Sequence, residues 1–353
     1  MPNPRYFDYA STSPIDPRVL AEMMPFLTDD FGNANSLHGF GQKAAVAVEL
    51  ARQRVAALID AEDPTQVLFT SGATEANNWV LNLHPDAAVS PFEHSSIDEY
   101  ASKGGLRRLA NDQSALLSWK GDATLICLMA VNNETGHIWN PEEIRGDALK
   151  VHSDATQIVG KLPFAVENLD YISLSAHKFY GPKGIGALYA RELPRSPYMF
   201  GGEQEFGLRG GTLNVPGIVG MGAACAIATD EMHRNETLAK IHRQTLIEGL
   251  QGLTDFLILS PENGSPFILS LSCLGVQGET LAIELDRHGY AVSSGAACSS
   301  RSSEPSHVLT AMGFDKEWVR GALRISLGTG VTQESAAALA YSLLQIVEKL
   351  RTM

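Results

Sequence analysis

Hydrophobic and polar positions follow a regular pattern along most of the chain and predict a succession of helices and strands. Helical spacing of the apolar residues predicts helices over 17–27, 42–59 and 73–83. Short apolar runs next to turn residues predict strands over 66–70, 125–131, 151–154, 171–175 and 185–190. Because these strands alternate with helices, we expect an α/β fold with a mainly parallel sheet and helices on both of its faces.

The pattern changes after about residue 230, where it indicates a second, smaller domain. Helices are expected there over 231–253, 277–288 and 334–350, and strands over 267–273, 291–293 and 322–327. We therefore assign residues 17–230 to a large domain. Residues 1–16 and 231–353 are assigned to a small α+β domain.

Composition narrows the classes of protein that fit this pattern. The chain has 353 residues, of which 44% are hydrophobic, so it is not disordered. Its formal net charge of −13 argues against direct nucleic-acid binding. We expect neither a signal peptide nor a membrane span. The four cysteines are scattered without a CxxC pair, which favours reduced thiols and a cytoplasmic location.

The first segment with chemical potential is Thr70–Asn77. A predicted strand ends there in a Gly turn, and a helix begins directly after it. Free backbone N–H groups and the positive end of the helix then meet, which favours a phosphate. The competing interpretation is an ordinary helix cap made by Ser71 or Thr74.

Two further strands end in residues that complement such a site. Asp154 places a carboxylate where parallel sheets bind ligands, although it could also be a turn aspartate. Lys178 follows an apolar strand and precedes a Gly/Pro-rich turn, a setting in which a lysine can act as an amine nucleophile. Lys183 competes for that role in the same turn. Together, a phosphate site, a carboxylate and a reactive lysine are the parts that bind pyridoxal 5'-phosphate.

The fourth segment, Val292–Ser306, surrounds Cys298 with small and polar residues, unlike the other three cysteines. We expect a mobile, exposed loop in which a thiol can react. An incidental surface cysteine is the alternative.

In combination, these segments resemble the cysteine desulfurases of the NifS/IscS type, which are class V, fold-type I pyridoxal-phosphate enzymes. The resemblance runs nearly end to end, and its motifs appear in the order that the family has: Tyr9–Pro14, Thr70–Glu75, Asn132–Gly136, His152–Gln157, Ser175–Lys178, Arg209–Thr212, Ser293–Cys298 and Leu323–Gly328. It implies a large domain with a seven-stranded, mainly parallel sheet and a smaller α+β domain that carries the cysteine loop.

The resemblance also implies roles around the cofactor ring. Lys178 would bind pyridoxal 5'-phosphate as a Schiff base, and Asp154 would pair with the ring nitrogen. Gln157 would reach the phenolic oxygen. His94 would stack on the ring and assist proton transfer.

The remaining implied roles concern the phosphate, the substrate and the sulfur. Ala73, Thr74, Ser175 and His177 would bind the phosphate. Thr212 would reach the phosphate in the second subunit of a homodimer, although Gly210 stands where the family usually has serine.

Arg324 and Asn133 would hold the carboxylate of L-cysteine. Cys298 would take the sulfur as a persulfide, leaving L-alanine, and pass it to an acceptor protein of unknown identity. Such sulfur serves iron–sulfur cluster assembly, tRNA or cofactor thiolation, or DNA phosphorothioation. A selenocysteine lyase, another class V enzyme that needs no thiol, and a partner subunit with low turnover are the alternatives.

Overall fold

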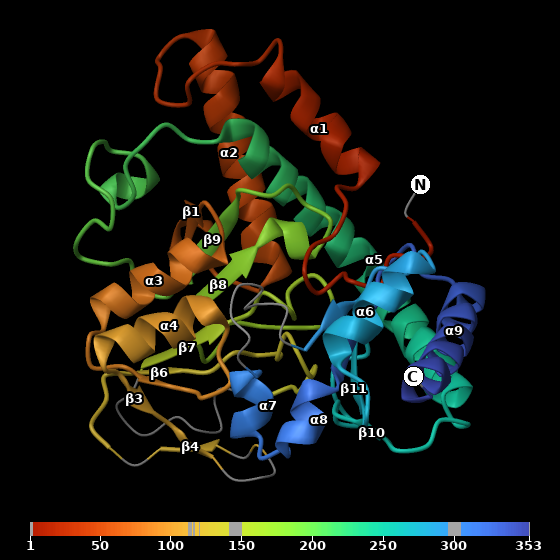
Figure 1. The fold of residues 1–353 in the computed structure, drawn as a ribbon. Coiled ribbons are helices and arrows are strands. Elements are labelled where there is room, and N and C mark those ends of the chain that lie inside the picture. The colour runs from red at the N-terminus through yellow and green to blue at the C-terminus, as the bar shows by residue number, and fades with distance from the viewer. Residues whose placement is uncertain are drawn as a thin grey trace.

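The structure is a computed structural model that describes residues 3–111, 115, 117–119, 121–140, 150–295 and 305–352. These residues form a seven-stranded sheet and a four-stranded sheet with helices packed against them, and a separate pair of short strands (Figure 1). The larger sheet carries most of the predicted site residues at one of its edges. No helix among the described residues is long and apolar enough to cross a membrane.

The larger sheet has seven strands in the order β1-β9-β8-β7-β6-β2-β3. Only β9 runs antiparallel to its neighbours, so the mainly parallel sheet is confirmed. Its strands are β1 (Val67–Thr70), β2 (Ala88–Val89), β3 (Arg107–Arg108), β6 (Leu125–Cys127), β7 (Lys150–Asp154), β8 (Tyr171–Ser175) and β9 (Gly186–Ala190).

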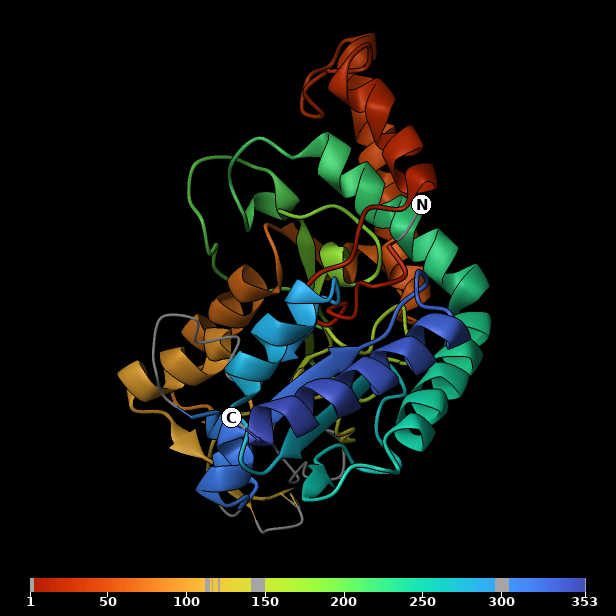
Figure 2. The ribbon, with the colours of Figure 1, turned by 45° about the vertical axis from the view of Figure 1, so that its right-hand side comes forward.

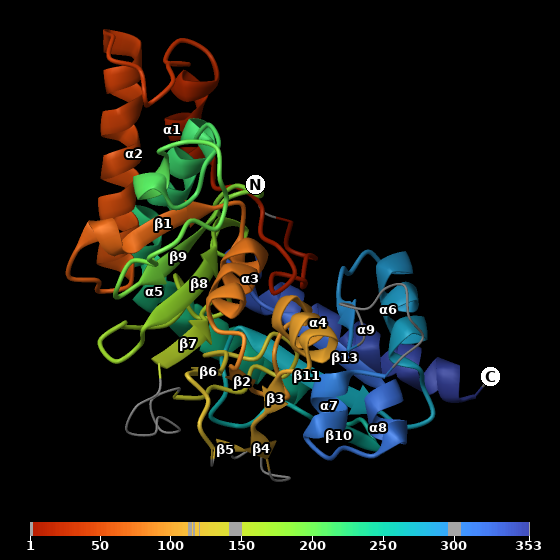
Figure 3. The same ribbon diagram turned by 90° about the vertical axis from the view of Figure 1, so that its left-hand side faces the viewer.

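Helices cover both faces of this sheet, as the sequence predicts. Val67 and Phe69 of β1 face the core shared with α1 (Pro17–Leu27), α2 (Gly39–Leu58) and α5 (Val215–Gly249). Leu68, between them, faces the opposite core, which includes residues of α3 (Ala73–Leu83) and α4 (Ser95–Gly104). This period of two along the strand assigns successive side chains to opposite layers. Figure 3 shows α3 and α4 in front of the strands and α2 and α5 behind them.

The smaller sheet is antiparallel and has the order β10-β11-β13-β12. The N-terminal segment joins it, because Tyr6 bridges to Ala291 and Asp8 bridges to Ser326. The last helix packs along the second half of α5 (Figure 2). The elements are β10 (Phe256–Ile258), β11 (Ile268–Cys273), α6 (Gly278–Arg287), β12 (Ser293–Ser294), β13 (Ala322–Ser326) and α9 (Gln333–Arg351).

Several shorter elements complete the described part of the fold. They are the 3-10 turns η1 (Pro64–Gln66), η3 (Ala176–Lys178) and η4 (Glu205–Gly207), the hairpin strands β4 (Ala110–Asn111) and β5 (Leu117–Ser118), and the helices α7 (His307–Ala311) and α8 (Lys316–Arg320).

Several elements differ from the prediction, and the strands β2, β3 and β10 were not predicted. The predicted strand 125–131 is regular only as far as Cys127, and Val131 then makes an isolated bridge to Ile138. The predicted helix 231–253 is the second half of α5, which already begins at Val215 and runs without a break past residue 230. Helix α4 was not predicted. The domain limit near residue 230 stays a prediction, and it falls inside this continuous helix.

Candidate active site

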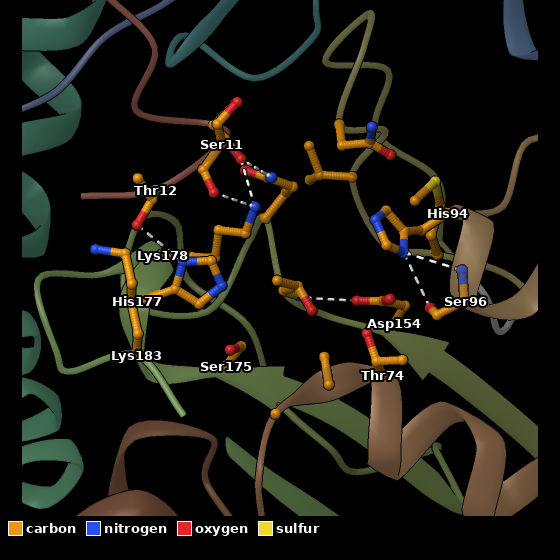
Figure 4. Close-up of a pocket in the computed structure, with 18 of the residues that line it drawn as sticks. Ser11, Thr12, Thr74, His94, Ser96, Asp154, Ser175, His177, Lys178 and Lys183 are labelled. Carbon is orange, nitrogen blue, oxygen red and sulfur yellow. Dashed lines mark hydrogen bonds between the residues drawn. The ribbon is translucent and has the colours of Figure 1, made fainter. Parts of the chain in front are cut away.

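One cavity of about 590 Å³ lies at the carboxyl ends of β1, β7 and β8. These strands point the same way in the sheet, so the residues that follow them meet at one edge. Of the predicted site residues that the structure describes, all except Thr212 line the cavity: Ala73, Thr74, His94, Asn133, Asp154, Gln157, Ser175, His177, Lys178 and Arg324. Figure 4 shows Lys178, Asp154, His94 and Thr74 around this common space.

The start of α3 forms one wall. Gly72 is the N-cap residue, and no side chain caps the helix, so the competing interpretation of a cap made by Ser71 or Thr74 is wrong. The Thr70 hydroxyl donates to the Gly72 carbonyl at 3.0 Å and fixes the turn. A Cβ on Gly186 of β9 would lie 2.6 Å from the Gly72 Cα, so only glycine lets the strand approach so closely. The uncapped helix start therefore offers N–H groups to an anion.

Lys178 lies at the end of η3, directly after β8. Its Nζ donates to the carbonyl oxygens of Ala10 and Ser11 at 2.6 and 2.8 Å, so the N-terminal segment holds the amine at the cavity. Lys183 also lines the cavity, but it lies on the exposed turn that follows. His177 Nδ1 lies 3.1 Å from the Thr12 hydroxyl. Burial and the charges of Lys178, Lys183 and Lys161 lower the pKa of His177 to about 4, so His177 is neutral at neutral pH.

Asp154 ends β7 and is almost fully buried. Its Oδ2 accepts 2.8 Å from Asn77 Nδ2, which comes from the buried face of α3. Its Oδ1 accepts 3.0 Å from the backbone N–H of Thr156. Both oxygens therefore have defined positions. Sequence analysis missed Asn77, because nothing in the pattern of α3 separates this amide from a polar surface residue.

His94 lies opposite Lys178 in the cavity and caps the start of α4. Its Nδ1 accepts 3.2 Å from the Ser96 N–H and lies 2.9 Å from the Ser96 hydroxyl. Burial lowers the pKa of His94, so the ring is neutral at neutral pH. Because Nδ1 accepts from the Ser96 N–H, the proton of the neutral ring lies on Nε2. Ser96, another residue that sequence analysis missed, thus sets both the orientation and the tautomer of His94.

Arg324 enters the cavity from β13 of the smaller sheet. Its guanidinium donates to Asp8, to Ser11 and to the carbonyl oxygen of Asn133 at 2.7–2.9 Å. Arg324 is 4% exposed. The two sheets and the N-terminal segment therefore meet at one positive group, which is suited to a carboxylate. Asp8 was not among the predicted site residues.

Cys298 lies outside the described residues. Described residues near both ends of that gap form hydrogen bonds to other parts of the chain. The Gly295 N–H donates to the Ala322 carbonyl at 2.9 Å, and the Ser306 hydroxyl donates to Glu134. Thr212 is exposed and does not line this cavity. The other three cysteines are buried free thiols, and burial raises the pKa of each. None of these three is poised to react.

Comparisons with known proteins identify the family of this chain. The family model described as aminotransferase class-V matches residues 5–339. The cysteine desulfurase IscS of Pectobacterium carotovorum is 41% identical, over 94% of this chain and 89% of its own length. A solved structure described as a NifS-like protein superposes with a TM-score of 0.89 at 36% identity, covering 99% of this chain and 100% of its own. One described as SspA in complex with cysteine has a TM-score of 0.78 at 32% identity and covers 92% and 98%.

The chain therefore belongs to the class V aminotransferases, in the branch of the NifS/IscS-type cysteine desulfurases. Enzymes of this family depend on pyridoxal 5'-phosphate, and the cavity fits that group. The uncapped start of α3 suits its phosphate, the fixed carboxylate of Asp154 suits a protonated ring nitrogen, and Lys178 supplies an amine between them. Among the described residues, no cluster of His, Cys, Asp and Glu could hold a metal ion.

Proposed function

We propose that this protein is a cysteine desulfurase that removes sulfur from L-cysteine, releases L-alanine and carries the sulfur on Cys298. One observation above all supports the proposal. A single cavity combines the amine of Lys178, the fixed carboxylate of Asp154, the uncapped start of α3 and the guanidinium of Arg324. Pyridoxal 5'-phosphate needs the first three of these groups, and the carboxylate of an amino-acid substrate needs the fourth.

Pyridoxal 5'-phosphate would be held by residues from three elements. Lys178 would bind it covalently, Asp154 would keep its ring nitrogen protonated and Gln157 would donate to its phenolic oxygen. The phosphate would lie at the start of α3, with Ala73, Thr74, Ser175 and His177. When bound, the cofactor supplies an electron sink that stabilises negative charge at the substrate α-carbon.

The chain's own residues then carry out the binding, proton and sulfur steps. Arg324 and Asn133 hold the carboxylate of L-cysteine, which orients the α-carbon. Lys178, released as a free amine, moves the α-proton, and the neutral His94 assists proton transfer at its Nε2. The Cys298 thiolate attacks the substrate sulfur, so that an S–S bond forms, the C–S bond breaks and its electron pair stays on carbon. Protonation of that carbon completes L-alanine.

We also propose a homodimer in which Thr212 reaches the phosphate bound by the other subunit. Two features support a second copy. Thr212 is exposed, away from the cavity of its own chain. Large apolar side chains in the loop after α1 and at the start of α2 are exposed, with Phe31 71%, Leu37 93% and Phe40 55% exposed, and the rings of Phe31 and Phe40 stack. Such clustering is typical of a protein interface. Sedimentation of the purified protein tests the dimer. A sulfur-acceptor protein of unknown identity and a cytoplasmic location stay predictions.

The decisive experiment measures L-alanine and sulfide from L-cysteine in the presence of pyridoxal 5'-phosphate and a reductant. Wild type should form both, Lys178→Ala neither, and Cys298→Ala neither although it still binds the cofactor. Equal alanine from wild type and Cys298→Ala would exclude the persulfide step and favour a selenocysteine lyase. A cofactor-loaded wild type that forms no alanine would contradict the proposal.

A further inference from the structure

Lys161 is a buried lysine that the proposed reaction does not use. It lies in the turn after β7 and is 7% exposed. Its Nζ donates a hydrogen bond of 2.8 Å to Gln157 Oε1. Among the described residues, no carboxylate forms an ion pair with it, and the charged groups that act on it are Lys178 and Arg324. A lysine in such a place is costly, because burial disfavours its charged form.

The turn that carries Lys161 packs directly against the segment of Lys178. Gly160 has a φ of +75°, and a Cβ there would lie 2.8 Å from the Phe179 Cβ. The position of Lys161 is therefore fixed relative to the reactive lysine. Burial, followed by the charges of Lys178 and Arg324, lowers the pKa of Lys161 to about 7. Protonated or neutral, its nitrogen can still donate to an amide oxygen.

The two neighbours of Gln157 settle how its amide lies. On one side, Lys161 donates to Oε1. On the other side, Gln157 Nε2 donates at 2.8 Å to the Ala10 carbonyl, which also accepts from Lys178. A carbonyl cannot donate, so a flipped amide would lose its bond to Ala10, and it would also lose the bond to Lys161 while that amine is protonated. The Nε2 group carries two hydrogens, and Ala10 takes one of them. The second is available to a ligand in the cavity that Gln157 lines.

We propose that Lys161 is a positioning residue for the cofactor: by holding Gln157 Oε1, it makes Gln157 a fixed hydrogen-bond donor toward a negatively charged oxygen in the cavity. This inference rests on the proposed function, because the oxygen in question is the phenolic oxygen of pyridoxal 5'-phosphate. A donor to that oxygen stabilises its charged form and loosens the proton that it shares with the Lys178 nitrogen.

The test is a pH titration of the visible absorption of the cofactor-loaded protein, without substrate. In Lys161→Met the midpoint of this titration should rise by about one pH unit, which is a tenfold gain in proton affinity. The reason is that nothing holds Gln157 Oε1 any longer, so the Nε2 donor is no longer fixed in place. Lys161→Arg, which can still donate to Oε1, should stay close to wild type. Lys150→Met is the control, since Lys150 is a partly exposed lysine at the other end of β7.

Gln157→Leu shows whether Lys161 acts through Gln157. This variant alone should raise the midpoint as Lys161→Met does, and adding Lys161→Met to it should change the midpoint no further. An unchanged midpoint in Lys161→Met, or an equal shift in both backgrounds, would overturn the inference. Failure of wild type and Lys150→Met to take up pyridoxal 5'-phosphate would instead overturn the proposed function. A thermal melt of each variant confirms that it is folded before it is titrated.

Discussion

Arg324 and Asp8 form an ion pair of 2.9 Å that joins β13 to the N-terminal segment beside the cavity. Ser11 reinforces the pair, because it accepts from Arg324 and donates to Asp8 at 2.7 and 2.8 Å. The guanidinium therefore has one orientation before any substrate arrives. Preorganisation of this kind lowers the entropy that substrate binding must overcome.

We predict that Asp8→Ala raises the KM for L-cysteine about tenfold, which corresponds to about 1.4 kcal/mol. The buried guanidinium loses its charged acceptor, so it no longer faces the substrate carboxylate in a fixed way. Stability should fall by about 1–3 kcal/mol for the same reason. Steady-state kinetics and urea unfolding measure the two effects. Glu22→Ala, which removes an exposed partner of Arg54, is the control and should leave KM unchanged. An unchanged KM in Asp8→Ala would show that Arg324 is positioned without Asp8.

A second prediction concerns Asn77, which fixes the carboxylate of Asp154. Asn77 is fully buried and also donates to the Ser96 hydroxyl at 2.8 Å, so it links Asp154 to the group that orients His94. Asn77→Ala should lower kcat/KM by about 10- to 100-fold, because a hydrogen bond to a charged group contributes about 1.5–3 kcal/mol. Asn82→Ala, on the exposed side of the same helix, is the matched control. Activity equal to that of Asn82→Ala would rule out this role.

The fold was largely predictable, because local patterns carry most of it. The predicted helices 17–27 and 73–83 and the strand 171–175 match the structure residue for residue. The first half of α5 was missed for a physical reason. Its residues from Val215 to Ala228 are buried on nearly every side and include several glycines, so they lack the polar face that reveals a helix.

The site was predictable where a motif lies in one stretch of sequence and was missed where the contact is long-range. Lys178, Asp154 and the Gly72 turn each follow a strand, a position that marks ligand sites in parallel sheets. Asp8, however, is 316 residues from Arg324, and Asn77 is 77 residues from Asp154. A single sequence holds no signal for such pairings, because they depend on how the finished layers pack.

A third prediction concerns the buried pair of Arg52 and Glu205, which supports β1 just before the Gly72 turn. The side chains are 3% and 0% exposed and share two hydrogen bonds of 2.9 Å. Glu205 also accepts from the Phe69 N–H at 2.7 Å. Glu205→Ala should lower the free energy of unfolding by about 3–5 kcal/mol, because the buried arginine loses its buried partner and keeps only the half-exposed Glu49 at 3.1 Å.

Urea unfolding measures this loss, and Glu99→Ala supplies the comparison. Glu99 pairs with Lys103 on the surface of α4, where an ion pair contributes about 0.3–0.5 kcal/mol. Replacing both members, as Arg52→Met with Glu205→Ala, should recover part of the stability, because no unpaired charge remains. If the double variant is as unstable as Glu205→Ala alone, the loss comes from the Phe69 contact and not from the charge of Arg52.

The last prediction concerns the pH dependence of stability and rests on Glu93, the residue before His94. Glu93 is fully buried, and one carboxyl oxygen accepts from the Met129 N–H at 2.8 Å. Burial, together with the charge of Asp154, raises the pKa of Glu93 to about 8. The folded protein thus binds this proton more tightly than the unfolded chain does. The stability that this proton contributes is fully present below the pKa that Glu93 has in the unfolded chain. It is lost as the pH rises toward and past the pKa of Glu93 in the folded protein.

Wild-type protein should therefore lose stability relative to Glu93→Gln between pH 6.5 and 8, by about 1.4 kcal/mol per pH unit. Urea unfolding of the cofactor-free protein at several pH values measures the slope. The neutral histidines act on the other side, because their pKa values are lowered and their contribution is lost only as the pH falls below about 6.5. The effect of Glu93 on stability therefore falls above pH 6.5, and the effect of the histidines falls below it. Equal slopes for wild type and Glu93→Gln above pH 6.5 would mean that Glu93 is already ionised in the folded protein, with its charge compensated inside the core.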